Sequence, residues 1–279
     1  MKKENCIFEK IYLFNQDIKK KQLLELIENM YNNICFSTFP YLIYNQENSK
    51  ISVQKFNSGT CISFCYFIKM YLKKNYGINS YIIPASVPSI FKVKGTPKMS
   101  HCAIVIPINL QEFYILDGAL YFLEPMFCSL KDNKERVILS SNAHRHKNTF
   151  IHYSLKKCDK IMIDEKIEQF LPNKTIRTSC YFRDIPNDLW DYYLCEIKNP
   201  DYNIGYSFIK NKEYPFIMKT YYQDGIVKLK YKLELQNNKI LIYEYPSGNM
   251  IYDGIANNNT QYINIMKELH PYFLDYITL

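Results

Sequence analysis

Glycine is scarce in this sequence: it accounts for 8 of the 279 residues, and tryptophan occurs once. No glycines form the G-x-G-x-x-G pattern of a dinucleotide-binding fold or the P-loop of a nucleotide hydrolase, and no serine lies in a G-x-S-x-G nucleophile elbow. The chain therefore lacks the short motifs of the common nucleotide-binding folds and of the serine hydrolases.

Long apolar runs are absent too. The longest, such as residues 102–106, have the length of a strand and cannot span a bilayer. Residues 1–5 lead into a charged segment without the apolar core of a signal peptide. The 9 cysteines are odd in number and irregularly spaced, as is typical of free thiols in a reducing compartment. We therefore expect a cytoplasmic protein without a membrane partner.

Positive charge is present but dispersed. The formal net charge is +8, yet the lysines are scattered and often alternate with apolar residues, which indicates a solvated surface. No Lys/Arg cluster accompanies a nucleic-acid-binding motif, so we expect no nucleic-acid partner. Hydrophobic residues make up 47% of the chain, enough for one large domain or for two to three packed subdomains.

The most informative stretch is residues 57–65, where a turn of small residues leads into an apolar helical pattern with Cys61 at the junction. The pattern continues to Gly77, a residue type that often ends helices. The amino end of a helix lowers the pKa of a thiol and favours the nucleophilic thiolate. Cys61 is therefore the candidate nucleophile.

Other segments are assigned from their periodicity. Residues 17–33 are predicted to form a helix capped by Asp17, and residues 164–171 a short helical or irregular segment. Strict alternation over residues 227–235 gives the clearest strand, followed by a turn at Asn237 and Asn238. Further strands are expected at 80–85, 101–106, 113–116, 137–139, 150–154, 160–163 and 239–245, and a closing helix at 260–269.

A base and an orienting acid for Cys61 are sought on the predicted hairpin. His101 opens its first strand and Asp117 closes its second. If the hairpin is centred on Asn109, His101 and Asp117 face each other directly, with Cβ atoms about 5 Å apart. A thiolate, an imidazole and a carboxylate are the components of Cys–His–acid catalysis.

Metal binding is the competing interpretation. Cys61 and Cys65 share one helix face, and His101 and Cys102 could add ligands, but zinc sites usually contain closer pairs such as C-x2-C. His101 and Cys102 should also point to opposite faces of their strand. A second pair, His144 and His146, lies in a polar stretch typical of an exposed loop. We therefore expect no metal.

These residues resemble the arylamine N-acetyltransferases, within the wider transglutaminase-like cysteine fold. His101 follows Cys61 by 40 residues and Asp117 follows by a further 16, whereas the histidine of papain-like enzymes lies about 130–150 residues past the cysteine. Residues 100–105 and 114–118 look like the family's His and Asp strands, and residues 214–235 with the closing helix look like its third subdomain.

The resemblance implies an α+β, papain/transglutaminase-like fold of three parts. These are a helical N-terminal subdomain with the nucleophilic Cys (1–90), a central antiparallel β-barrel with His and Asp (91–200), and a C-terminal α/β lid (201–279). It also implies ping-pong transfer of an acyl group from acetyl-CoA or another acyl-CoA, through a Cys61 thioester, to a small-molecule or protein amine. His101 would be the general base and acid, and Asp117 would orient it.

Two family motifs are altered here. The nucleophile motif R-G-G-x-C-x-E is replaced by residues 57–63, N-S-G-T-C-I-S, and the glycine-rich V-G-F-G that follows the acid is replaced by residues 118–121, G-A-L-Y. Loss of a glycine hinders close approach of backbone to a phosphate. Two alternatives therefore remain: a cysteine protease, amidase or transglutaminase-like enzyme with the same triad, and a non-catalytic binding protein on this fold.

Overall fold

The structure, a computed structural model, describes residues 13–15, 17–44, 49–91, 101–131, 135–156, 166–171, 174–179, 192–197, 215–255 and 259–269. The strand predicted at 160–163 lies outside these residues. Side chains are described for all of these ranges except 156, 166–171, 174–179 and 192–194.

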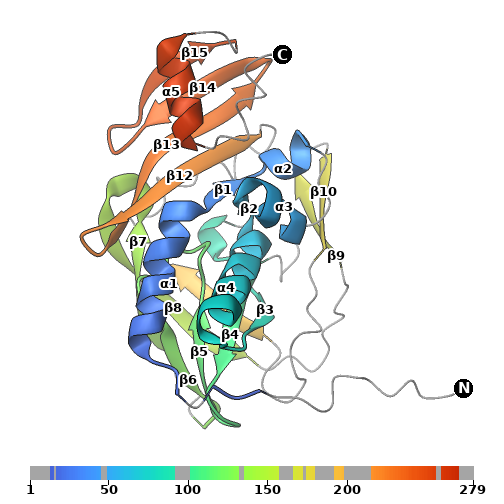
Figure 1. Ribbon diagram of the computed structural model, residues 1–279, viewed down its shortest axis with the longest axis vertical. Coiled ribbons are helices and arrows are strands. Elements are labelled where there is room, and N and C mark those ends of the chain that lie inside the picture. The colour runs from blue at the N-terminus through green and yellow to red at the C-terminus, as the bar shows by residue number, and fades with distance from the viewer. Residues whose placement is uncertain are drawn as a thin grey trace, which may run out of the picture.

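Helix α1 (Lys20–Asn33) packs one face into the main core. It begins after Lys19, whose N–H donates to the Gln22 side chain at 2.9 Å, so the predicted cap at Asp17 is wrong. Leu24 is exposed on this helix, whereas Leu26 is buried. The helix covers the central sheet together with α4 (Figure 1).

Helix α4 (Cys61–Tyr76) confirms the helix predicted from the 57–65 stretch. It ends at Gly77, which has φ of 68°, a left-handed conformation that glycine adopts without strain. Its apolar side chains are buried against β4, so the helix is fixed with Cys61 at its first position. The chain enters it through α2 (Phe39–Leu42), α3 (Ser49–Phe56) and the short strand β2 (Ser58–Gly59).

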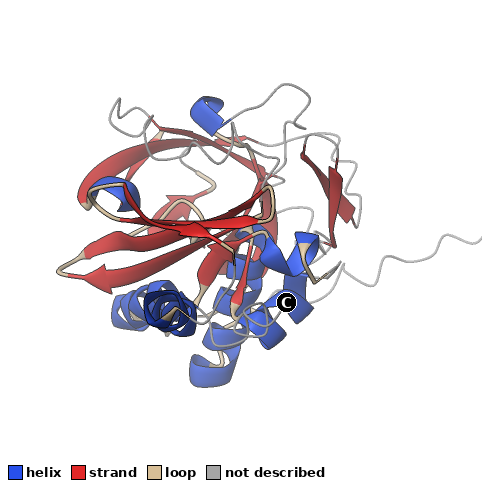
Figure 2. Cartoon of the chain, turned by 90° about the horizontal axis from the view of Figure 1, so that it is seen from above, coloured by secondary structure: helices blue, strands red, loops and turns tan. Residues whose placement is uncertain are grey.

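The central sheet has seven strands in the order β6-β5-β4-β3-β11-β8-β7. Figure 2 shows that strands of the molecule are strongly curved and that the longer helices lie together on one side of them. Its strands are β3 (Tyr81–Ala85), β4 (His101–Pro107), β5 (Glu112–Leu116), β6 (Met126–Ser129), β7 (Arg136–Asn142), β8 (Lys147–Lys156) and β11 (Tyr192–Ile197). Two short 3-10 helices, η2 (Ser89–Phe91) and η3 (Ala143–Arg145), lie between strands.

The β-barrel expected for this layer is not confirmed. Within the described part of the chain, the edge strands β6 and β7 do not pair with each other, so the sheet does not close. A single bridge joins Phe122 to Ser140. Residues 166–171, expected to be helical or irregular, instead form strand β9 (Lys166–Leu171), which pairs with β10 (Lys174–Ser179) in a separate hairpin.

A second sheet contains the C-terminal part of the chain. Its strands lie in the order β15-β14-β13-β12-β1-β2. Besides β2, they are β12 (Phe216–Gln223), β13 (Ile226–Gln236), β14 (Lys239–Glu244), β15 (Asn249–Gly254) and the early strand β1 (Cys35–Ser37). The alternating strand and the helix α5 (Thr260–Leu269) are as predicted, whereas β15 was not anticipated. Because β12 pairs with β1, the two ends of the chain share one sheet.

No helix in the described ranges is both long and apolar enough to cross a membrane.

Candidate active site

The turn before Cys61 is held by hydrogen bonds around one tyrosine. The Tyr41 hydroxyl lies 3.0 Å from Ser63 Oγ and accepts the N–H of Thr60 at 3.4 Å. Gly59 has φ of 151°, and a Cβ there would lie 2.0 Å from Ser63 Oγ. Only glycine fits this position, because any side chain would displace the first turn of α4 and Cys61 with it.

The hairpin that carries His101 and Asp117 has a different register from the one we predicted. Ile104 pairs with Leu116 and Ile106 with Tyr114, so the hairpin is centred on Leu110 rather than Asn109. His101 and Asp117 are therefore diagonal neighbours and not directly opposed. Since the error is two residues, both side chains keep the same face, and diagonal neighbours can still meet.

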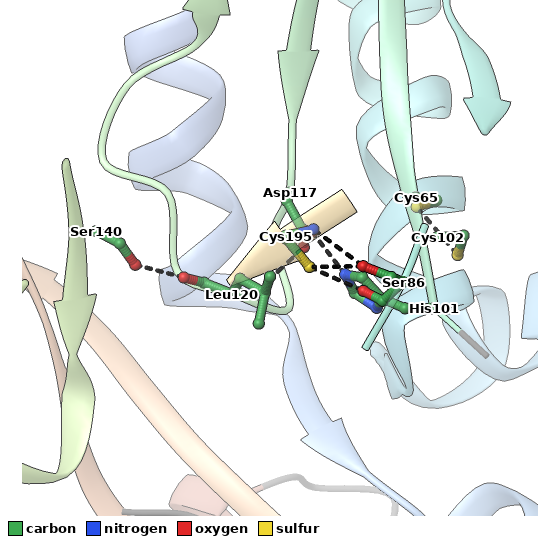
Figure 3. A network of polar contacts seen from close by, with 8 residues as sticks. All are labelled: Cys65, Ser86, His101, Cys102, Asp117, Leu120, Ser140 and Cys195. Atoms are coloured by element: carbon green, nitrogen blue, oxygen red, sulfur yellow. Dashed lines mark hydrogen bonds and ion pairs between the residues drawn. The ribbon is translucent and has the colours of Figure 1, made fainter. Parts of the chain in front are cut away.

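The two side chains do meet. His101 Nε2 lies 2.6 Å from Asp117 Oδ2, and both residues are buried (Figure 3). This bond fixes the plane of the imidazole, and the same ring acts on the Cys61 thiol. Cys61 and His101 each retain slight exposure, 5% and 6%, whereas Asp117 is 1% exposed.

Asp117 is itself held in place by the turn that follows it. The N–H of Leu120 donates to Asp117 Oδ1 at 3.1 Å, and the N–H of Phe122 donates to the Asp117 carbonyl at 3.3 Å. Ser140 on β7 donates to the Leu120 carbonyl and lies 2.9 Å from that of Tyr121 (Figure 3). The carboxylate is thus positioned by two elements, the hairpin and β7.

The electrostatics favour a thiolate. A hydrogen bond from Cys102 lowers the pKa of Cys61, burial opposes this, and the hydrogen bond and charge of His101 lower it further, to about 5. Burial alone would lower the pKa of His101, but the Asp117 carboxylate and the Cys61 thiolate raise it well above its ordinary value. Near neutral pH the pair is therefore a thiolate beside an imidazolium, the reactive form of a cysteine nucleophile.

Cys102 is the neighbour that our sequence interpretation missed. We set it aside because strand alternation turns it away from His101, yet its sulfur lies 3.5 Å from that of Cys65, and Cys102 lowers the pKa of Cys61. The sequence contained no signal for this contact, because it depends on how β4 crosses α4. Beside the site, Cys195 Sγ donates to the Ser86 carbonyl at 2.8 Å.

The metal interpretation finds no support in the part of the chain that the structure describes, which contains no group of three His, Cys, Asp or Glu side chains able to hold a metal ion. His144 and His146 lie at η3 rather than in an exposed loop. His146 Nε2 bonds to the Leu229 carbonyl at 2.8 Å, and the His144 ring packs edge-on against Tyr245.

No protein-family model matches the chain, and no curated protein matches it by sequence. The fold is similar to the NAT3 arylamine N-acetyltransferase from Bacillus cereus, described as having a unique Cys-His-Glu catalytic triad (13% identity, 90% of each chain, TM-score 0.49). It is also similar to arylamine N-acetyltransferase C from Bacillus anthracis (15% identity, 90% of this chain and 91% of that chain, TM-score 0.49). A third similar structure is the arylamine N-acetyltransferase from M. tuberculosis (10% identity, 95% of this chain and 91% of that chain, TM-score 0.44). These three neighbours are all arylamine N-acetyltransferases.

Proposed function

We propose that this protein is a cysteine-dependent acyltransferase that works through a Cys61 thioester. The observation that supports this most directly is the 2.6 Å bond between His101 and Asp117, placed beside a thiol at the first position of α4. The bond orients an imidazole that interacts with the sulfur and whose charge favours the thiolate. Buried structural cysteines have no such base.

The reaction has two displacement steps. The Cys61 thiolate attacks the acyl carbonyl, and the leaving group takes its proton from the His101 imidazolium, which leaves a thioester and a neutral imidazole. An amine then attacks the thioester and gives its proton to His101, and the thiolate is released. Asp117 stabilises the imidazolium that forms in each cycle. The side chain of Thr60 does not cap α4, so it does not compete for the N–H groups at the amino end of the helix, and these are the proposed donors to the developing oxyanion.

Acetyl-CoA or another acyl-CoA is the proposed donor, on the strength of the sequence resemblance. The turn that follows the acid fits a pyrophosphate poorly, however. The N–H groups of Leu120 and Phe122 are bonded to Asp117, that of Tyr121 is bonded to the Gly118 carbonyl, and the side chains of the turn are buried. This favours a second candidate, an amidase- or transglutaminase-like enzyme whose acyl donor is not CoA.

The test is the mass of the intact protein after exposure to two donors. p-Nitrophenyl acetate needs no CoA site, so it should add the mass of one acetyl group to the wild type and none to the Cys61→Ser variant. Acetyl-CoA should do the same if CoA is the donor. Acylation by the ester alone selects the second candidate. Failure of both donors, with Cys61 no more reactive than Cys65, contradicts the proposal and leaves a binding protein.

The acceptor is proposed to be an amine, on a small molecule or on a protein. Once the acyl-protein is isolated, an arylamine or hydrazine should remove the acyl group faster than buffer alone, with formation of the amide. Loss of the acyl group at the same rate with and without the amine would identify a hydrolase instead.

A further inference from the structure

The hydroxyl of Tyr41, on α2, is the centre of a buried hydrogen-bond network beside Cys61. It lies 2.8 Å from Ser49 Oγ and 3.0 Å from Ser63 Oγ, and it accepts the N–H of Thr60 at 3.4 Å. Ser63 Oγ in turn donates to the Ser49 carbonyl at 3.3 Å. All four residues are buried. Three elements, α2, α3 and α4, therefore meet at one oxygen.

Only one arrangement of the hydroxyl protons satisfies all four contacts. A carbonyl cannot donate, so the single proton of Ser63 points to Ser49, and Ser63 Oγ accepts from Tyr41. This uses the one proton of Tyr41, so its oxygen accepts from Ser49 Oγ and from the Thr60 N–H. The phenol then makes one donated and two accepted bonds. Because no proton remains for the Cys61 sulfur or for a substrate, Tyr41 is not a general acid in this arrangement.

We propose that Tyr41 is a positioning residue, whose hydroxyl fixes the Cys61 sulfur by holding the chain on both sides of it. The assignment rests on the proposed role of Cys61 as nucleophile. Thr60 precedes Cys61, and Ser63 follows it within the first turn of α4, so the two bonds together fix the start of the helix. A shift of about 1 Å in a reacting atom can cost about 100-fold in rate, and the network prevents such a shift.

The tyrosine is itself anchored on the C-terminal sheet. Its N–H donates to the Thr38 carbonyl at 3.1 Å, and the N–H of Thr38 donates to the Phe216 carbonyl on β12 at 3.0 Å. The N–H of Phe216 returns a bond to Thr38 Oγ1 at 3.0 Å. The hydroxyl that holds the turn is therefore supported by a sheet strand, as a positioning residue requires.

The experiment compares Tyr41→Phe, which keeps the ring and removes the hydroxyl, with the wild type in two assays. Acylation by p-nitrophenyl acetate should slow about 10- to 100-fold. The midpoint of iodoacetamide labelling of Cys61 against pH should move upward, because a displaced sulfur is less stabilised by the His101 imidazolium. A merely structural role would lower stability without moving this midpoint. The labelling needs no acyl donor, so it reports on Tyr41 even where acyl transfer is not observed.

Thr220→Val is the matched control. It also removes a buried hydroxyl that makes a hydrogen bond, since Thr220 Oγ1 donates to the Tyr31 carbonyl at 3.1 Å, but it lies on β12 rather than on the turn before α4. It should lose stability in urea unfolding, as Tyr41→Phe does, and keep the wild-type acylation rate and labelling midpoint. An equal slowing in Thr220→Val would overturn the proposal.

Ser63→Ala removes the same bond from the other side and should slow acylation by a similar factor. Because the two groups act through one bond, the double variant should be no slower than the slower single variant. If Tyr41→Phe does not fold, Ser63→Ala decides alone through the same rate and midpoint. A wild-type rate and midpoint in either folded variant, or fully additive losses in the double variant, would overturn the proposal.

Discussion

At the scale of single residues, the reactive centre depends on positions that tolerate little change. Asp117 is 1% exposed and bonds to His101 through one oxygen and to the backbone of Leu120 through the other. Gly59 lies where a side chain would collide with Ser63. Asp117 orients the imidazole, and Gly59 allows the turn that presents Cys61.

Asp117→Asn should lower the rate of acylation of Cys61 by on the order of 10³-fold, because the amide cannot stabilise the imidazolium. Asp253→Asn is the control: this aspartate pairs with Lys239 at 3.3 Å on the exposed C-terminal sheet and should leave the rate unchanged. Stopped-flow acylation with p-nitrophenyl acetate measures both. Equal rates for wild type and Asp117→Asn would exclude Asp117 from the reaction.

Gly59→Ala should reduce the acylation rate at least about tenfold and also destabilise the fold, since the added Cβ has to displace Ser63 and Tyr41. Gly77→Ala also places a Cβ at a positive φ, but with open space around it and far along α4 from Cys61. It should cost stability, about 1 kcal/mol, but retain the rate. Similar rates in the two variants would contradict the role given to Gly59.

At the scale of elements, the site is assembled from α4, the β4–β5 hairpin and the turn tied to β7. The sequence predicted α4 with its end at Gly77, because helical periodicity and a C-terminal glycine agree there. It predicted the hairpin with the wrong centre. Asn109 caps the turn by accepting the N–H groups of Gln111 and Glu112, and the centre of the hairpin therefore lies one residue further along the chain, at Leu110. Turn geometry of this kind is not encoded in apolar periodicity.

The link from β7 to the Asp117 turn gives a prediction at this scale. Ser140→Ala removes the donor to the Leu120 carbonyl and should cost about 1–3 kcal/mol of unfolding free energy, because this buried acceptor loses its partner, whereas the Tyr121 carbonyl keeps the N–H of Ser141. Urea unfolding measures this, and the acylation rate should fall as Asp117 loosens.

Thr149→Val is the matched control, because Thr149 faces Ser140 across the β7–β8 pair. Its buried hydroxyl has no hydrogen-bond partner among the described residues, so its removal should be neutral or stabilising. A larger loss of stability in Thr149→Val than in Ser140→Ala would contradict this account of the turn.

At the scale of the whole molecule, the C-terminal sheet contacts the rest of the protein along α1, β7 and η3. Strand β12 pairs with β1, which lies just before the segment leading to Cys61, and η3 of the central layer packs against the C-terminal sheet through His144 and Tyr245. Neither contact was predictable, because both join segments far apart in the sequence. The boundaries at 90 and 200 remain predictions, as does the lid.

The buried His144 between the two sheets should make the stability of the protein sensitive to acid. Burial, with the charges of Lys232 and His146, lowers the pKa of His144 to about 3, whereas the unfolded chain takes up this proton near the ordinary value of 6.5. The unfolded state then binds more protons as the pH falls, so between about pH 7.5 and about pH 5 this residue alone costs about 2 kcal/mol of stability.

His144→Phe keeps a ring against Tyr245 and removes the titration, so urea unfolding of this variant should lose about 2 kcal/mol less than the wild type over the same interval. Parallel pH dependence in the wild type and His144→Phe would show that His144 is not buried in its neutral form.

The central claim, that Cys61 is held as a thiolate by His101 and its neighbours, is tested most directly by the labelling rate of Cys61 as a function of pH in the wild-type protein. A thiolate beside an imidazolium should give a midpoint at the lowered pKa of about 5 and a constant rate through neutral pH. A midpoint near about 8.5, the value of a free cysteine, would contradict it.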